Sequence, residues 1–129
     1  MLTDDLEAIR ALIHRYAELI DLGELDALAA LFTHATWSSP GRGTPRTKHV
    51  ITNLVVDVDE ASGTATARSY FTVVQARPDF QLQPVIAGCY HDRFVHVDDE
   101  WRFADRQIIP DLIGDLSHHL RNPADVGRS

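Results

Sequence analysis

The chain has 129 residues, 44% of them hydrophobic, so one domain spanning residues 1–129 with a sizeable apolar core is expected. Its net charge of −7, without a lysine- and arginine-rich stripe, argues against nucleic acid or anionic membrane as a partner. The single cysteine, Cys89, excludes an internal disulfide framework. With no long apolar run and no leader pattern, these features indicate a soluble, cytoplasmic protein.

The first predicted elements are two helices joined by a tight turn at Gly23. Acidic residues at 4, 5 and 7 suit the positive start of the first helix. Its apolar residues recur at helical spacing and form one stripe: Leu6, Ile9, Ile13, Tyr16, Ala17 and Ile20. A second, shorter helix begins near Glu24 and carries Leu25, Leu28, Ala29, Leu31 and Phe32. Neither helix can bury its stripe alone, so a packed helical hairpin is expected.

The rest of the chain reads mainly as strands. A short strand and a loop are expected over residues 33–45, and long strands over 49–58, 65–75, 85–97 and 101–110, with Pro110 ending the last. In the third long strand Gly88, Tyr90, Asp92 and Phe94 share one face. Helices followed by consecutive antiparallel strands predict an α+β fold. Residues 117–129 are expected to form a flexible tail.

His49 stands at the start of the first long strand, where alternation places it on one face with Ile51, Asn53 and Val55. A histidine on a core-facing surface is costly unless it is satisfied, and a structural histidine bonded to a neighbour is the simpler explanation. Asp21 lies in the last turn of the first helix, where the macrodipole disfavours an acid. It is therefore either solvated or held for a purpose, while Tyr16 is expected in the core with its hydroxyl bonded.

Other chemistries find little support in the sequence. The pair at residues 118 and 119 is an adjacent histidine pair without the spacing of a metal motif, so no metal site is expected. The nucleophile elbow and the phosphate-binding glycine loop are absent from the sequence.

Several motifs, spread over nearly the whole chain, carry a family resemblance. They are residues 15–17 with 20–21, 29–32 with 35–37, 47–53, 88–94, 101–103 and 111–115. Together they resemble the SnoaL-like branch of the NTF2-like superfamily. The resemblance implies a cone-shaped α+β barrel, in which a curved antiparallel sheet wraps around the N-terminal helical hairpin and a deep pocket. It also implies a homo-oligomer, a dimer or a trimer, formed through the outer face of the sheet.

Relatives in this branch include scytalone dehydratase, bile acid 7α-dehydratase and hexachlorocyclohexane dehydrochlorinase. They are similar in using an Asp at the end of the first helix with a His at the start of a strand, which match Asp21 and His49. The bile acid enzyme also has a Tyr at the position of Tyr16. The dehydrochlorinase needs an Arg near the end of the last strand, where this chain reads Pro110-Asp111. That departure argues against halide elimination.

Two functional hypotheses follow. The first is a cofactor-independent lyase or isomerase, dehydratase-like, acting on an apolar, ring-containing small molecule with His49 as general base, oriented by Asp21 and assisted by Tyr16. Pairing with Asp21 is expected to raise the pKa of His49 above about 6.5. Candidate substrate contacts are Trp37, Asn53, Phe71 and Tyr90. The second hypothesis is a non-catalytic module of the same fold that binds a small molecule or oligomerises.

The segment between Trp37 and Thr47 departs from the family pattern. Relatives usually carry a further helix there, across the mouth of the pocket, whereas this segment is rich in Pro and Gly and has no apolar helical period. The sequence leaves open whether a lid exists in this protein.

Overall fold

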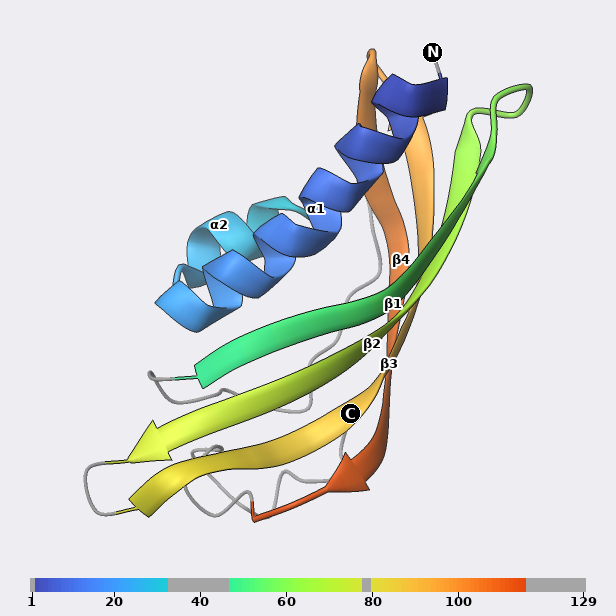
Figure 1. The fold of residues 1–129 in the computed structure, drawn as a ribbon. Helices are drawn as coiled ribbons and strands as arrows, with labels where there is room; N and C mark the ends of the chain where they lie inside the picture. Colours follow the sequence, from blue (N-terminus) through green and yellow to red (C-terminus); the bar gives the residue numbers. More distant parts are fainter. Residues whose placement is uncertain (1, 33–46, 78–79, 116–129) are drawn as a thin grey trace.

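The computed structural model describes residues 2–32, 47–77 and 80–115. In these ranges two helices precede a four-stranded antiparallel sheet of order β1-β2-β3-β4. The sheet is long and strongly curved, and both helices lie on its concave side (Figure 1). The predicted α+β cone fold is confirmed. The elements are α1 (Leu2–Leu22), α2 (Leu25–Ala30), β1 (Thr47–Asp59), β2 (Thr64–Arg77), β3 (Phe80–Val97) and β4 (Glu100–Ile113).

Gly23 ends α1, as the sequence predicted. Its φ of 73° lies in the left-handed region that glycine adopts without steric cost. The N–H of Gly23 donates to the carbonyl of Ile20, and the N–H of Glu24 donates to that of Leu19. This pair of bonds satisfies the last carbonyls of the helix and turns the chain directly into α2. The predicted hairpin is confirmed, and Leu19 joins the buried stripe of α1 although it was not expected there.

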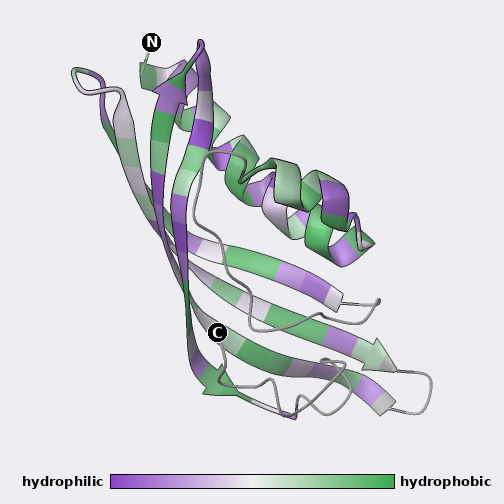
Figure 2. Cartoon of the chain, turned by 180° about the vertical axis from the view of Figure 1, so that it is seen from behind, coloured by the Kyte–Doolittle hydropathy of each residue, from purple (hydrophilic) through white to green (hydrophobic). Residues whose placement is uncertain are grey.

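Aromatic rings fill the space between α1, α2 and the concave face of the sheet. Tyr16 makes edge-on contacts with Phe32 and Tyr90, and Phe71 stacks on Tyr90 with ring centroids 4.5 Å apart. At the other end of α1, the indole N–H of Trp101 donates to Asp5 at 3.0 Å. Figure 2 shows polar and apolar residues following one another along the strands, as expected for a sheet with one face against the core.

The predicted alternation of β1 is wrong from Asn53 onward. Asn53 has φ 53°, and the register of β1 with β2 shifts between Thr52 and Val55. This bulge reverses the phase of the strand, so Asn53 and Val55 are exposed while Leu54 and Val56 turn inward. Asparagine tolerates the left-handed conformation better than most residues, which explains its place at the bulge.

Pro110 does not end the last strand, contrary to the prediction. β4 continues to Ile113, and Pro110 pairs with Gly88 where the register of β3 with β4 shifts. In the described sheet β4 is an edge strand, and an edge tolerates a residue that lacks an N–H. A Cβ at Gly88 would collide with the backbone of Ile109 and Pro110, so the absence of a side chain there lets the two paired strands approach closely at the register shift.

Candidate functional site

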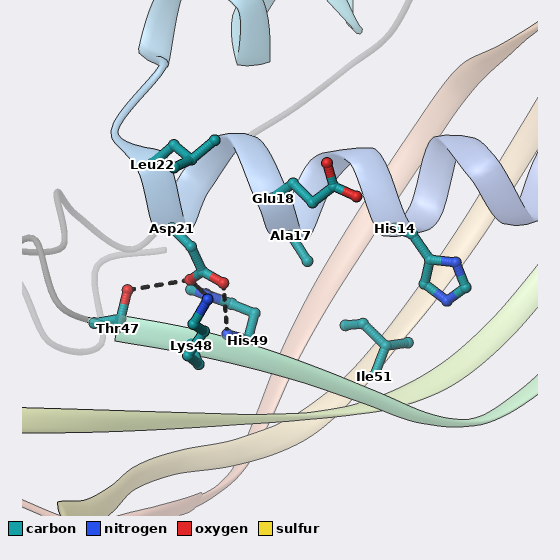
Figure 3. A pocket seen from close by; sticks show the side chains of 9 residues that line it. All are labelled: His14, Ala17, Glu18, Asp21, Leu22, Thr47, Lys48, His49 and Ile51. Carbon is teal, nitrogen blue, oxygen red and sulfur yellow. Dashed lines mark hydrogen bonds and ion pairs between the residues drawn. The ribbon is translucent and has the colours of Figure 1, made fainter.

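Asp21 and His49 meet where the end of α1 passes over the start of β1 (Figure 3). The ring nitrogen Nδ1 of His49 lies 2.6 Å from Oδ1 of Asp21. The two side chains are only 9% and 12% exposed, so water screens this contact weakly. The structure thus brings together the two residues that the sequence singled out.

The Asp21 carboxylate also accepts two further hydrogen bonds from β1. The backbone N–H of His49 donates to Oδ2 at 2.9 Å, and the hydroxyl of Thr47 donates to Oδ1 at 3.2 Å. Because β1 is an edge strand of the described sheet, the N–H of His49 points away from β2 and takes the carboxylate as its acceptor. These donors offset the unfavourable position of an acid at the end of a helix.

The contact with Asp21 sets the protonation pattern of the imidazole. A carboxylate only accepts, so the Nδ1 proton is the one donated to Asp21, and Nε2 carries the free lone pair of the neutral ring. Burial lowers the pKa of His49 below its ordinary value; this outweighs the upward effect of Asp21, and the charge of Arg106 lowers it further. The predicted rise is therefore wrong, because desolvation of the charged ring exceeds the gain from pairing. A neutral His49 is the form that accepts a proton.

A cavity of about 580 Å³ adjoins this pair between α1 and β1. Ala17, Leu22 and Ile51 give it apolar walls, and Glu18 and Lys48 are exposed polar residues that also line it. Such a cavity is large enough for a small organic molecule. Its lining residues are His14, Ala17, Glu18, Asp21, Leu22, Thr47, Lys48, His49 and Ile51.

Tyr16, Phe71 and Tyr90 do not line this cavity but lie deeper, in the ring cluster. Tyr16 is 1% exposed and packs edge-on against Tyr90, with ring centroids 5.8 Å apart. Burial raises the pKa of Tyr90 far above its ordinary value, so its hydroxyl keeps the proton at neutral pH. The parts of these three residues in a reaction stay predictions.

Of the remaining positions that the sequence predicted, one is described by the structure and the others are not. Asn53 is exposed on the bulge of β1, out of phase with His49 and outside the lining of the cavity. Trp37 lies outside the described residues. The segment between Trp37 and Thr47 and the predicted tail 117–129, which includes the histidine pair at 118 and 119, also lie outside them.

Sequence reasoning missed a buried ion pair between Asp92 and Arg106. Nε and one terminal nitrogen of Arg106 donate to the two carboxylate oxygens at 2.7 and 3.0 Å, and neither side chain is exposed. Within the part of the chain that the structure describes, the other terminal nitrogen of Arg106 is buried without a hydrogen-bond partner. The guanidinium lies 3.7 Å from the ring centre of Tyr90 and 4.2 Å from that of Tyr16. Although burial opposes the charge, hydrogen bonds with Asp92 raise the pKa of Arg106.

A signal for this pair did exist on β3, where alternation placed Asp92 on the buried face. Alternation along β4 did not predict its partner Arg106, because the pairing of β3 with β4 contains a register shift. The register of β3 with β4 shifts between Arg93 and Phe94, so that Phe103 and Arg106, three residues apart, both face the core. Strict alternation from Phe103 would have turned Asp105 inward instead.

The family model described as "SnoaL-like domain" matches residues 34–107, more than half of the chain. The chain belongs to the SnoaL-like domain family. Solved structures show a similar fold. This SnoaL-like domain is similar to Rv3472(D26N), a protein of unknown function from Mycobacterium tuberculosis, with 26% identity, a TM-score of 0.74, and 95% of this chain and 90% of that chain covered.

Two proteins from Novosphingobium aromaticivorans show the same fold. An NTF2-like protein with a cystatin-like fold matches with 24% identity and a TM-score of 0.71, covering 91% of this chain and 88% of that chain. A protein with the provisional name scytalone dehydratase matches with 21% identity and a TM-score of 0.70, covering 98% and 96%. No curated protein matches the sequence of this chain.

Across residues 2–32, 47–77 and 80–115, no three His, Cys, Asp or Glu side chains are grouped in a way that could hold a metal ion. Neither described helix of the SnoaL-like domain has the length and apolar character needed to cross a membrane.

Proposed function

We propose that this SnoaL-like domain is a cofactor-independent lyase or isomerase that uses His49 as general base on an apolar, ring-containing small molecule. The observation that carries the proposal is the contact between His49 and Asp21 at the wall of a partly apolar cavity. A neutral imidazole, oriented by a carboxylate on one nitrogen and unprotonated on the other, is suited to accepting a proton near neutral pH.

In the proposed reaction, Nε2 of His49 removes a proton from a carbon next to a carbonyl group of the substrate. The imidazolium that forms keeps its Nδ1 proton in the hydrogen bond to Asp21, whose negative charge stabilises it. The same proton then returns from Nε2, either to a departing hydroxyl group, which leaves as water, or to another carbon of the substrate. General base catalysis of this kind contributes on the order of 10²–10⁴-fold in rate. Proton transfer alone accomplishes it, so the proposal needs no cofactor.

Tyr16 has a proposed part as the group that polarises the carbonyl. Its ring lies in the interior of the cone under the guanidinium of Arg106, where a hydroxyl is shielded from water. Because Tyr16 is buried outside the lining of the cavity, this part requires the packing between His49 and the ring cluster to open when substrate binds. Phe71 and Tyr90 would then be apolar contacts for the substrate ring. Asn53 has no place in this proposal, because it is exposed on the bulge.

Self-association through the outer face of the sheet is a second part of the proposal. Large apolar residues stand exposed on that face or at its border: Val50 (45%), Tyr70 (57%) and Leu112 (71%). Exposed apolar groups on a sheet face favour burial against another surface, and a second copy of the chain is the partner proposed. We place this homo-oligomer in the cytoplasm, because a single cysteine suits a reducing compartment.

Proton abstraction can be tested before the substrate is known. A panel of ring-containing β-hydroxy ketones and enones would be incubated with the protein in D₂O, and deuterium uptake next to the carbonyl would be followed by mass spectrometry. We expect uptake with the wild-type protein, loss of it with His49→Ala, and no loss with His91→Ala, which removes an exposed histidine of β3. Equal uptake with His49→Ala would exclude His49 as the base. Binding without uptake would favour the non-catalytic module.

A further inference from the structure

Thr47 contacts the same carboxylate oxygen that holds the ring of His49. It is the first residue of β1 and is 5% exposed. Its hydroxyl lies 3.2 Å from Oδ1 of Asp21, the atom that stands 2.6 Å from Nδ1 of His49 (Figure 3). Because an ionised carboxylate has no proton to give, the hydroxyl of Thr47 is the donor. One carboxylate oxygen is therefore shared by two donors from the same strand.

We propose that Thr47 is a positioning residue that controls the basicity of His49 through Asp21. The hydroxyl fixes Oδ1 beside the imidazole and takes up part of its negative charge, which moderates the pull of the carboxylate on the Nδ1 proton. The catalytic meaning of this role rests on the proposed function. The effect of Thr47 on the titration of the His49 ring is independent of the proposed function.

The backbone of β1 explains why a second donor matters. The N–H of His49 holds Oδ2 of Asp21 at 2.9 Å, and the imidazole Nδ1, 2.6 Å from Oδ1, belongs to the ring that has to be oriented. With these two contacts alone, the carboxylate and the ring could turn together about Oδ2. The hydroxyl of Thr47 holds the other oxygen, so the plane of the carboxylate is set from two points two residues apart on one strand. Thr47 is β-branched, which restricts its side-chain rotation, and its burial keeps water from replacing the hydroxyl.

The charged and titratable surroundings of His49 come from three elements. Asp21, Glu18 and His14 face the cavity from α1, and Lys48 does so from β1. The charge of Arg106, on β4, also acts on the His49 ring. Thr47 donates its hydrogen bond to Asp21, so a change in the titration of His49 after loss of the hydroxyl reports on the carboxylate.

The test is an NMR titration of the His49 ring in the full chain. Thr47→Val keeps the shape of the side chain and removes the donor, so the whole charge of Oδ1 acts on the imidazole. We expect the titration midpoint of His49 to rise by about 0.5 pH units. Thr47→Ser restores the donor and should return the midpoint to that of wild type. Thr52→Val is the matched control, because it removes an exposed hydroxyl from the same strand.

A midpoint that is unchanged or lower in Thr47→Val would overturn the proposal, as would a rise that Thr47→Ser shares. Deuterium uptake separates this failure from failure of the proposed function. If His49→Ala abolishes uptake while Thr47→Val leaves the midpoint unchanged, the base assignment stands and the role of Thr47 is wrong. If His49→Ala retains uptake, the proposed function is wrong, whereas a raised midpoint in Thr47→Val still supports the contact with Asp21.

Discussion

The guanidinium of Arg106 lies 3.7 Å from the centre of the Tyr90 ring, with its edge held by Asp92. The same guanidinium covers the ring of Tyr16 at 4.2 Å, so a single cation joins α1 to β3 and β4 inside the cone. Contacts between a cation and aromatic faces strengthen when water is excluded, and the Arg106 side chain is fully buried. The structure thus contains a charged centre beneath the helix that carries Asp21.

Arg106→Met should strongly destabilise the protein. The substitution keeps much of the side-chain length but leaves the carboxylate of Asp92 buried without its cation, which costs about 3–5 kcal/mol. Urea unfolding would measure the free energy. The double variant Arg106→Met with Asp92→Leu removes both charges and should recover a large part of the loss. A single variant within about 1 kcal/mol of wild type would contradict this view of the pair.

Gly88→Ala should destabilise the protein more than Gly23→Ala. An added Cβ at Gly88 meets the Ile109 carbonyl oxygen and Pro110 Cα, and backbone atoms cannot move aside as a flexible side chain would. Overpacking of this kind costs about 1–3 kcal/mol or more. At Gly23 no atom of the described residues stands within 4 Å of an added Cβ, so the strain of φ 73° remains, about 1 kcal/mol. Thermal and urea unfolding of the two variants would compare their stabilities. Equal losses would show that the paired backbones of β3 and β4 adapt to the added methyl group.

Stability should fall on acidification through the titration of His49. Burial lowers the folded-state pKa of His49 below its unfolded value of about 6.5, so the unfolded state binds the proton first. The contribution is fully present above about pH 6.5 and is lost as the pH falls from there through the folded-state pKa. Urea unfolding between pH 5 and 8 would measure it. His49→Gln, which does not titrate, should lose this part of the pH dependence. If the free energy of unfolding instead rose on acidification in wild type and not in His49→Gln, pairing with Asp21 would raise the pKa of His49 more than burial lowers it.

Asp21→Asn should reduce proton abstraction while the fold remains. The amide can accept the backbone N–H of His49, but it no longer supplies a negative charge for the imidazolium. We expect deuterium uptake to fall by about 10²–10⁴-fold. Asp26→Asn, a change of an exposed acid on α2, serves as the control. Undiminished uptake in Asp21→Asn would mean that His49 does not need the carboxylate for this reaction.

The local sequence by itself determined the turn between the two helices, the buried face of β3 and two candidate site residues. The α1–α2 turn follows from Gly23, whose φ of 73° suits glycine, and the buried face of β3 follows from period-two alternation. Asp21 and His49 stood out because an acid at a helix end and a histidine in an apolar strand are each costly without a partner.

Only the tertiary structure decided the phase of the strands and the balance of charges. A bulge at Asn53 and a register shift between Arg93 and Phe94 each add one residue, which reverses every later side chain on a strand, so Asn53 turned out and Arg106 turned in. The direction of the His49 pKa shift was likewise beyond the sequence. Pairing and burial act on it in opposite senses, and burial is a property of everything that packs around the ring.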